Sequence, residues 1–531
     1  MLHHRTRMEI RETMTRPKSG EHFDYVVVGS GIGGLAIGAL LAHAGKRVLI
    51  LERHYHAGGY GQTFQAGRFA FCAELHYVWD CGEGQRVHRM LKKLGLEQQI
   101  RFRTLNPDGF DRVLAPGIDY TIGNDFDREH QRLAKLFPEH GDNLRRYFRT
   151  VSHIHEEMYK LPIGFSWWTM AAHPIRYRHI LRYIGWSLQD FFDSLAFPRP
   201  LQLILAGQSA IFFTPPRTLS LLAHAAGVGS YNTGAYVPEQ SFAHVIESLV
   251  AFIRNQPGSN VKLSTEVTHI DIVDGQARAV QTNRGEHFAA DCVLFDGDPQ
   301  LSLALIGPER FPADFRKKLT YEYGPSALSV YLGLEGIDLR AAGLGDENTH
   351  WHPSDDLNAI YDRHMEPSIP EEPYFFCDAP TLRMSDARMA PPGGHQLVMV
   401  SPCSYSYFRG LRDRDEAEYQ RAKATYAARL INLVEKHIVP GISRHVVTQV
   451  VGSPLTNERY VHAPRGNCYG VPLDTSHINF GHLNYRSPFP NLYYVGTGSA
   501  MPGFASLCHF ACLLYEELTG DRFYSNGRND L

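Results

Sequence analysis

The pattern of apolar and polar positions near the N-terminus predicts a strand, a glycine-rich turn, a helix and a second strand between Asp24 and Glu52. Residues 25–28 form a short apolar run, rich in β-branched side chains, that is typical of a buried parallel strand. The run GSGIGG follows directly, and the helix begins inside these glycines. Residues 47–51 predict the second strand. This order is that of a βαβ nucleotide-binding unit.

Each glycine of the turn has a separate physical role in such a unit. Gly29 permits the tight turn, Gly31 lets the backbone approach a pyrophosphate, and Gly34 lets the helix pack closely on the strand. The helix N-terminus then attracts phosphate charge. Glu52, at the end of the second strand, is positioned to accept hydrogen bonds from a ribose. A second glycine pair follows closely, as a second pass of backbone along an extended FAD requires. The predicted dinucleotide contacts in this region are Gly29, Gly31, Gly33, Gly34, Glu52, Arg53, Gly58 and Gly59.

Farther along the chain, the spacing of the apolar positions changes several times. Residues 106–231 are mostly helical in pattern, and residues 241–255 predict a helix with apolar positions three and four apart. Three strands joined by short glycine turns are predicted at residues 261–273, 276–283 and 287–299. Further predicted elements are strands at 328–334, 395–405 and 491–495, a helix at 416–438 and a helix that opens at Gly503.

This alternation predicts an α/β protein with two discontinuous domains, a Rossmann-type FAD-binding domain and an α+β substrate domain. A chain of 531 residues is long for one core, so two domains are expected. The predicted bounds are 1–21 for a mobile arm, 22–105, 232–300 and 480–531 for the FAD domain, and 106–231 and 301–479 for the substrate domain.

Composition narrows the class of partner. The formal net charge is −3, so no nucleic-acid partner is implied. The 29 Phe, 27 Tyr and 5 Trp predict a large apolar cavity or surface. Eight scattered cysteines without a CxxC pair favour a reduced, cytoplasmic setting. The N-terminal segment lacks a secretory apolar region, and no apolar run reaches the roughly 18 to 20 residues that span a bilayer.

One aromatic and basic stretch indicates peripheral contact with a membrane. Trp167, Trp168 and Trp186 alternate with arginines, including Arg176 and Arg178, in a pattern that suits lipid headgroups. The alternative is an ordinary amphipathic segment whose apolar face covers a substrate cavity.

Four stretches resemble the phytoene desaturase, carotenoid isomerase and retinol saturase family of FAD-dependent oxidoreductases. They are VVVGSGIGGLAIGALLAHAGKRVLILERHYHAGG, GAYVPEQSFAHVIESLV, SPLTNERYVHAPRGNCYG and NLYYVGTGSAMPG, and the similarity covers most of the chain in the correct order. The resemblance implies FAD as cofactor, a glutathione reductase-like fold, and cofactor contacts from Val267, Gly496, Gly498 and Gly503. The helix that opens at Gly503 would direct its N-terminus toward the flavin ring.

By the same resemblance, residues 67–80 approach the flavin and the substrate. Glu74 stands where the family usually has a small residue, and Glu74, His76 and Tyr77 are the candidate catalytic residues. Glu74 and His76 are interpreted either as a proton-handling pair or as a charge paired elsewhere and a packing histidine.

The leading hypothesis is an FAD-dependent oxidoreductase that saturates, desaturates or isomerises carbon–carbon bonds of a lipophilic polyene or isoprenoid. The segment at Gly227 and Gly229 lacks a second nucleotide pattern, so an external electron donor or acceptor is expected. No nucleophile triad or metal cluster is visible in the sequence. The alternatives are a flavin amine oxidase and a non-catalytic, escort-like lipid-binding protein.

Overall fold

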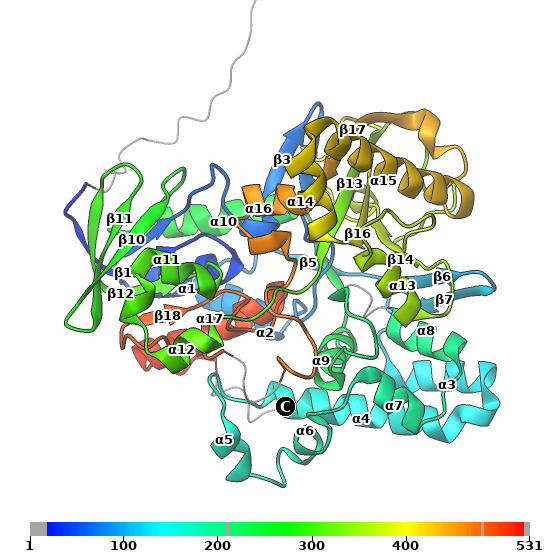
Figure 1. The fold of residues 1–531 in the computed structure, drawn as a ribbon, viewed down its shortest axis with the longest axis horizontal. Helices are drawn as coiled ribbons and strands as arrows, with labels where there is room; N and C mark the ends of the chain where they lie inside the picture. The colour runs from blue at the N-terminus through cyan, green and yellow to red at the C-terminus, as the bar shows by residue number, and fades with distance from the viewer. Residues whose placement is uncertain (1–17, 208–211, 479–482, 525–531) are drawn as a thin grey trace, which may run out of the picture.

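Two seven-stranded sheets organise the described part of the chain, which in this computed structural model comprises residues 18–207, 212–478 and 483–524. The sheets lie in separate halves of the molecule, and segments distant in sequence contribute to each (Figure 1). Most of the predicted N-terminal arm, residues 1–17, lies outside the described residues.

The first sheet contains the predicted nucleotide-binding unit. Strand β1 (His22–Val28) pairs in parallel with β2 (Val48–Leu51) and with β12 (His287–Phe295). Helix α1 (Ile32–His43) connects β1 to β2, which confirms the predicted order. The other strands of this sheet are β9 (Asn260–Lys262) beside β2, β11 (Gln276–Thr282) and β10 (Val267–Val273) beyond β12, and β18 (Leu492–Tyr494) beside β12.

The expectation of one strand over residues 261–273 is wrong. The chain breaks at Ser264, a non-glycine residue with a φ of 52°. It therefore forms β9 at one edge of the sheet, parallel to β2, and β10 at the other edge. Residues 261–263 and residues 267–273 look continuous in sequence because both alternate apolar and polar positions, and only their pairing partners distinguish them.

Helix α1 lies at the centre of the dinucleotide half. Its residues from Ile32 to Ala42 are all buried, because helices α10 (Phe242–Arg254) and α17 (Phe504–Thr519) pack against it together with the sheet. This explains why α1 is apolar on every side instead of amphipathic. Nearby are α2 (Arg86–Leu94), the hairpin of β3 (Thr63–Ala66) and β4 (Phe69–Cys72), and the paired strands β5 (Phe102–Thr104) and β8 (Tyr236–Pro238).

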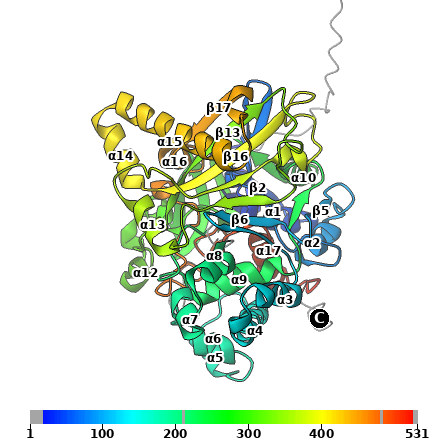
Figure 2. The same cartoon turned by 90° about the vertical axis from the view of Figure 1, so that its right-hand side faces the viewer.

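The second sheet supplies the wall opposite the dinucleotide half. Its order is β17 (Val446–Gly452), β13 (Ser326–Leu334), β16 (His395–Cys403), β15 (Phe375–Asp378), β14 (Asn348–Trp351), β6 (Asp111–Ala115) and β7 (Ile118–Ile122). The predicted strands at β13 and β16 and the predicted long helix α15 (Glu416–His437) are confirmed. Figure 2 shows α15 beside β13 and β16 at one end of the molecule.

The region 106–231 is mostly helical, as predicted, but it opens with the hairpin β6–β7, which the sequence interpretation missed. Its helices gather at the end of the molecule away from α15 (Figure 2). They are α3 (Phe126–Leu136), α4 (Gly141–Tyr159), α5 (Trp167–Ala171), α6 (Arg178–Tyr183), α7 (Leu188–Ser194), α8 (Arg199–Gly207) and α9 (Leu221–Tyr231).

Shorter helices complete the fold: α11 (Ser302–Ile306), α12 (Ala313–Lys318), α13 (Leu357–Met365), α14 (Tyr405–Arg414) and α16 (Pro454–Tyr460). All eight cysteines are free thiols. Within the described ranges, no helix is both long enough and apolar enough to cross a membrane.

Candidate functional site

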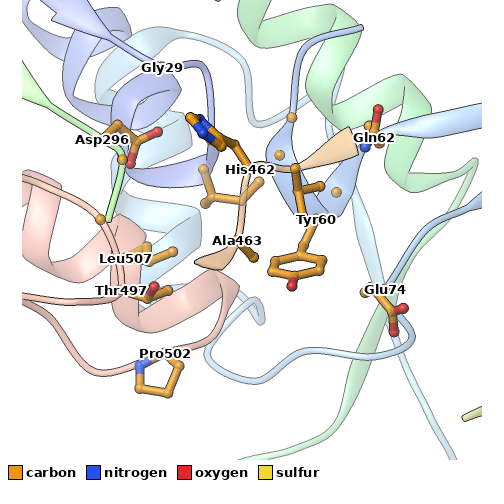
Figure 3. Close-up of a pocket in the computed structure, with 18 of the residues that line it drawn as sticks. Gly29, Tyr60, Gln62, Glu74, Asp296, His462, Ala463, Thr497, Pro502 and Leu507 are labelled. Carbon is orange, nitrogen blue, oxygen red and sulfur yellow. The ribbon is translucent and has the colours of Figure 1, made fainter. Parts of the chain in front are cut away.

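A cavity of about 510 Å³ lies where the two halves meet. The dinucleotide half lines it with the glycine turn after β1 and with the start of α17, and the second half lines it with side chains of β15 and β16. Figure 3 shows Gly29 and Asp296 on one side of this cavity, Glu74 on the other, and Tyr60 between them. The predicted cofactor and catalytic segments therefore share one space.

The glycine turn is packed so tightly that side chains would not fit. Gly29 has a φ of 103°, a conformation that L side chains rarely adopt. A Cβ on Gly31 would lie 2.6 Å from Asp296 Oδ2, and a Cβ on Gly34 would lie 2.7 Å from the carbonyl oxygen of Gly29. A Cβ on Gly33 would clash with the carbonyl oxygen of Val495. Gly29 and Gly31 line the cavity, whereas Gly33 and Gly34 permit close packing behind it.

Glu52 ties the turn to the end of β2. Its Oε2 accepts hydrogen bonds from the Ser30 amide at 2.8 Å and the Ser30 hydroxyl at 2.7 Å, and its Oε1 accepts one from the His54 amide at 2.7 Å. A carboxylate has about four acceptor positions, so Glu52 retains capacity for a ribose hydroxyl. Arg53 follows it at the exposed edge of the cavity.

The second glycine pair lies against the first. The Gly58 amide donates to the Ser30 carbonyl oxygen at 2.9 Å, and a Cβ on Gly59 would lie 3.3 Å from the Gly31 Cα. Of the remaining predicted contacts, Val267, Gly496 and Gly503 line the cavity. Gly498 does not belong to the lining, and its position instead permits contact with Pro299.

The N-terminus of α1 fits a phosphate group. Its N-cap is Gly31, which offers no side-chain cap, and its first turn contains no acidic residue. The first amides of a helix lack intrahelical acceptors and carry partial positive charge, so an anion beside Gly31 and Ile32 would satisfy them. The turn, Glu52 and the Gly58–Gly59 pair thus fit a dinucleotide.

Asp296, directly after β12, is a buried carboxyl group beside this phosphate position. Its Oδ2 has no hydrogen bond of good geometry among the described residues, although the amides of Gly31 and Gly34 are its nearest polar groups. Burial, together with the charge of Glu52, raises the pKa of Asp296 from its ordinary value of 3.8 to about 8. At neutral pH the carboxyl group is therefore protonated and does not repel a phosphate.

The titration of Asp296 predicts a pH-dependent stability. Because the folded pKa lies above the unfolded one, the folded chain binds the extra proton, and this contribution is complete below about 3.8 and lost as the pH rises through about 8. The free energy of unfolding of wild type should therefore fall over this interval, as measured by urea titration at several pH values. The fall should be smaller in Asp296→Asn, and equal slopes in both proteins would contradict the assignment.

The candidate catalytic pair lies across the cavity. Glu74 Oε2 and His76 Nε2 are 4.0 Å apart, and both side chains line the cavity. The Ser329 hydroxyl donates to Glu74 Oε1 at 2.7 Å. Burial raises the pKa of Glu74, and His76 and the Ser329 hydroxyl oppose that rise. The two side chains thus form a close pair in the cavity lining, and their role in proton handling remains a prediction.

Tyr77 has a different environment. Its hydroxyl donates to Asp111 Oδ2 at 2.9 Å, and its ring stacks on Tyr231 and Phe376. Burial and the Asp111 charge raise the pKa of Tyr77 well above its usual range. The Tyr77 hydroxyl therefore keeps its proton and donates it in a hydrogen bond to Asp111. The ring of Tyr77 forms part of the cavity wall.

Several residues of the site were missed by sequence reasoning. Asp378 on β15 lies 3.2 Å from His76 Nδ1, although 302 residues separate them. Tyr60 donates its hydroxyl to the Asn467 carbonyl oxygen and so ties the two cavity walls together. Aromatic rings complete the lining on the side of Glu74: Phe212, Phe213, Tyr231, Phe376 and Tyr469. The high aromatic content was the one sequence signal for this wall.

Comparison with known proteins gives one family model and many full-length relatives. The model of an NAD(P)-binding Rossmann-like domain matches residues 27–94, which confirms a dinucleotide-binding domain at the glycine turn. The chain is 26% identical to all-trans-retinol 13,14-reductase of Danio rerio, over 91% of this chain and 84% of that protein. It is 23% identical to chloroplastic prolycopene isomerase of Arabidopsis thaliana, over 92% and 81%.

Solved structures support the fold. A double mutant of putrescine oxidase superposes with a TM-score of 0.61 at 14% identity, over 94% of this chain and 99% of that one. Together with the relatives, this confirms the α/β fold class and the resemblance stated from the sequence motifs, since proteins from two branches of the family match along almost the whole chain.

Proposed function

We propose that this chain, a relative of the retinol reductases and carotenoid isomerases, is an FAD-dependent oxidoreductase that acts on carbon–carbon single or double bonds of a lipophilic polyene or isoprenoid. The reaction is saturation, desaturation or isomerisation. The observation that carries the proposal is the single cavity that joins the glycine turn to Glu74, His76 and the aromatic wall.

The protein's part in the reaction follows from that cavity. FAD, held by the glycine turn, Glu52 and the start of α17, would supply hydride chemistry. The aromatic wall would bind an apolar chain and exclude water. His76 and Glu74 would hold or move one proton at the substrate carbon, and the Ser329 hydroxyl would orient Glu74.

The electron partner is proposed to be a separate molecule. Gly227 and Gly229, whose spacing could begin a second nucleotide-binding turn, lie inside helix α9. A helix interior lacks the strand-to-helix turn that cradles a pyrophosphate. An external donor or acceptor is therefore expected to exchange electrons with the enzyme.

The absorbance spectrum of the purified protein tests this function. Flavin bands are expected, and anaerobic addition of a polyene should bleach them for desaturation or reoxidise the reduced form for saturation. Isomerised product without a lasting change in the flavin would identify an isomerase. Turnover of amines with peroxide release would instead support an amine oxidase, and a protein without flavin would overturn the oxidoreductase proposal in favour of lipid binding.

We also propose peripheral contact with a membrane through α5 and the loop after it. Trp167, Trp168 and Ile175 are 50%, 78% and 82% exposed, and the exposed Arg176 and Arg178 lie next to them. Trp186, by contrast, packs against the helical core. Exposed tryptophan beside arginine suits the headgroup region of an anionic bilayer, and a lipophilic substrate would enter from there.

Replacement of both Trp167 and Trp168 by serine is expected to weaken binding to anionic liposomes by roughly tenfold or more, since each ring contributes about 1.5 kcal/mol or more of apolar transfer. Cosedimentation with vesicles of phosphatidylcholine and phosphatidylserine measures this. Val447→Ser, which also removes an exposed apolar side chain, serves as the control. Equal partitioning of the tryptophan variant and wild type would reject the membrane contact.

A further inference from the structure

Asp378 is a fully buried carboxyl group at the end of β15, behind the cavity wall. We propose that Asp378 is a positioning residue that fixes the hydrogen of His76 on Nδ1, so that Nε2, on the side of the ring next to Glu74, gives or takes the proton of the reaction. This inference rests on the proposed function. Asp378 is a positioning residue and not a catalytic one, because it touches His76 and does not line the cavity.

The charge of Asp378 follows from its contact with Arg383. Its Oδ2 accepts a hydrogen bond from Arg383, whose side chain is 1% exposed. A guanidinium group is always charged in proteins, and burial of such a charge requires an anionic partner. Asp378 is therefore ionised, and an ionised carboxylate only accepts hydrogen bonds. The Asp378–His76 contact of 3.2 Å then requires that Nδ1 carries the hydrogen.

His76 Nε2 has no hydrogen-bond partner within the described part of the chain. It lies 4.0 Å from Glu74 Oε2, and both residues line the cavity. A buried, unsatisfied nitrogen is costly unless a ligand or water meets it. The ring nitrogen left without a partner is thus the one beside Glu74, and Glu74 and His76 are both residues of the cavity lining.

A series of hydrogen bonds extends from Arg383 and holds the side chains around Asp378 in place. Arg383 also donates to Asn348 Oδ1 at 2.6 Å, the Asn348 amide donates to Asp111 Oδ1 at 2.6 Å, and Tyr77 donates to Asp111 Oδ2. His350 Nε2 lies 3.9 Å from Asp111, but burial lowers the pKa of His350 to about 3, so it adds no charge.

The network connects two buried carboxyl groups to one guanidinium group, Asp378 directly and Asp111 through Asn348. Asp378 and Asp111 are the carboxylates, and Arg383 is the cation. Glu74, the remaining titratable group that faces His76, has a pKa raised by burial.

Addition of hydrogen to a double bond consumes one proton and one hydride equivalent. The Nε2–H of an imidazolium at His76 would give its proton to one carbon, and FAD held by the glycine turn and Glu52 would, in its reduced form, supply a hydride equivalent with two electrons for the other carbon. The π bond breaks and two C–H bonds form. Neutral His76 keeps the hydrogen on Nδ1, which remains hydrogen-bonded to Asp378. An external donor of two electrons, together with two solvent protons, one for the hydride equivalent and one for His76, would restore the enzyme, and removal of hydrogen would pass two electrons and two protons in reverse to an external acceptor.

Asp378→Asn tests the inference because it should invert the histidine tautomer. Arg383 can only donate, so the amide oxygen of the new side chain faces Arg383 and its NH₂ group faces His76. Nδ1 must then accept, and the hydrogen moves to Nε2. In a serine protease triad the same Asp→Asn change lowers kcat by about 10⁴ through the wrong tautomer. We expect a loss of turnover of roughly 10²- to 10⁴-fold with KM unchanged.

The tautomer has its own readout. In holoprotein labelled with ¹⁵N-histidine, the His76 signals are identified by their loss in His76→Gln. Wild type should show a protonated Nδ1 and an unprotonated Nε2 above the titration of the ring, and Asp378→Asn should show the reverse. Asp271→Asn is the matched control, because it breaks an exposed Asp–His contact of 3.1 Å to His287, and it should alter neither the His76 signals nor turnover.

Two results would overturn the inference. One is a protonated Nε2 on neutral His76 in wild type, which decides the question even if Asp378→Asn fails to fold. The other is wild-type turnover in Asp378→Asn despite an inverted tautomer. These outcomes are distinct from failure of the proposed function, which the absence of flavin or of polyene turnover in wild type would show.

Discussion

Gly31→Val is expected to yield a folded protein that binds its dinucleotide more weakly than wild type does and therefore contains less flavin. Gly31 has a φ of −64°, so valine causes no backbone strain. A Cβ at this position already lies 2.6 Å from Asp296 Oδ2, and the two valine methyl groups extend into the space beside the first amides of α1. Overpacking costs about 1–3 kcal/mol, which corresponds to a loss of affinity of roughly 5- to 150-fold, and the displaced phosphate also loses its helix amides.

The ratio of flavin to protein absorbance, together with flavin released by acid, measures this effect. Gly410→Val is the matched control, because Gly410 lies in α14 with a negative φ and no atom within 4 Å of its Cβ position. The control should contain as much flavin as wild type. Wild-type flavin content in Gly31→Val would show that the phosphate binds elsewhere.

His76→Ala is expected to lower turnover by roughly 10²- to 10⁴-fold, the usual contribution of a general acid or base. Flavin content should remain at the wild-type level, because Gly29 in the glycine turn lies across the cavity from Glu74, the neighbour of His76 (Figure 3). A loss in kcat without a rise in KM would indicate an interaction made in the transition state.

Single-turnover kinetics with the reduced or oxidised enzyme isolates the chemical step from electron exchange. His269→Ala is the control, since His269 is a 44% exposed histidine on β10, outside the cavity lining. Unchanged kinetics in His76→Ala would make His76 a packing residue, in line with the alternative that the sequence left open.

The dinucleotide unit was predictable because all its determinants are local. The strand β1, the turn at Gly29 and Gly31, helix α1 and the acid at Glu52 occupy one short stretch, and each has a pattern of its own. The same is true of α10 and α15, whose apolar periodicity is contained within each helix. Glu74 and His76 also became candidates from one short segment.

The rest of the site depends on partners that periodicity does not encode. β9 and β10 separate because one pairs with β2 and the other with β11, and the hairpin β6–β7 joins a sheet whose other strands come more than 200 residues later. Asp296 reaches the glycine turn, and Asp378 reaches His76, only through such long-range pairing.

The sequence by itself determined the nucleotide-binding unit and the fold class, because glycine spacing and hydrophobic period act within a few turns of chain. Only the tertiary structure decided which buried charges meet. Burial raises the pKa of Asp296 to about 8, and Arg383 sets the charge of Asp378 and through it the hydrogen on His76. Such effects depend on desolvation and on distances of a few ångströms between residues far apart in sequence, which exist only once the sheets have assembled.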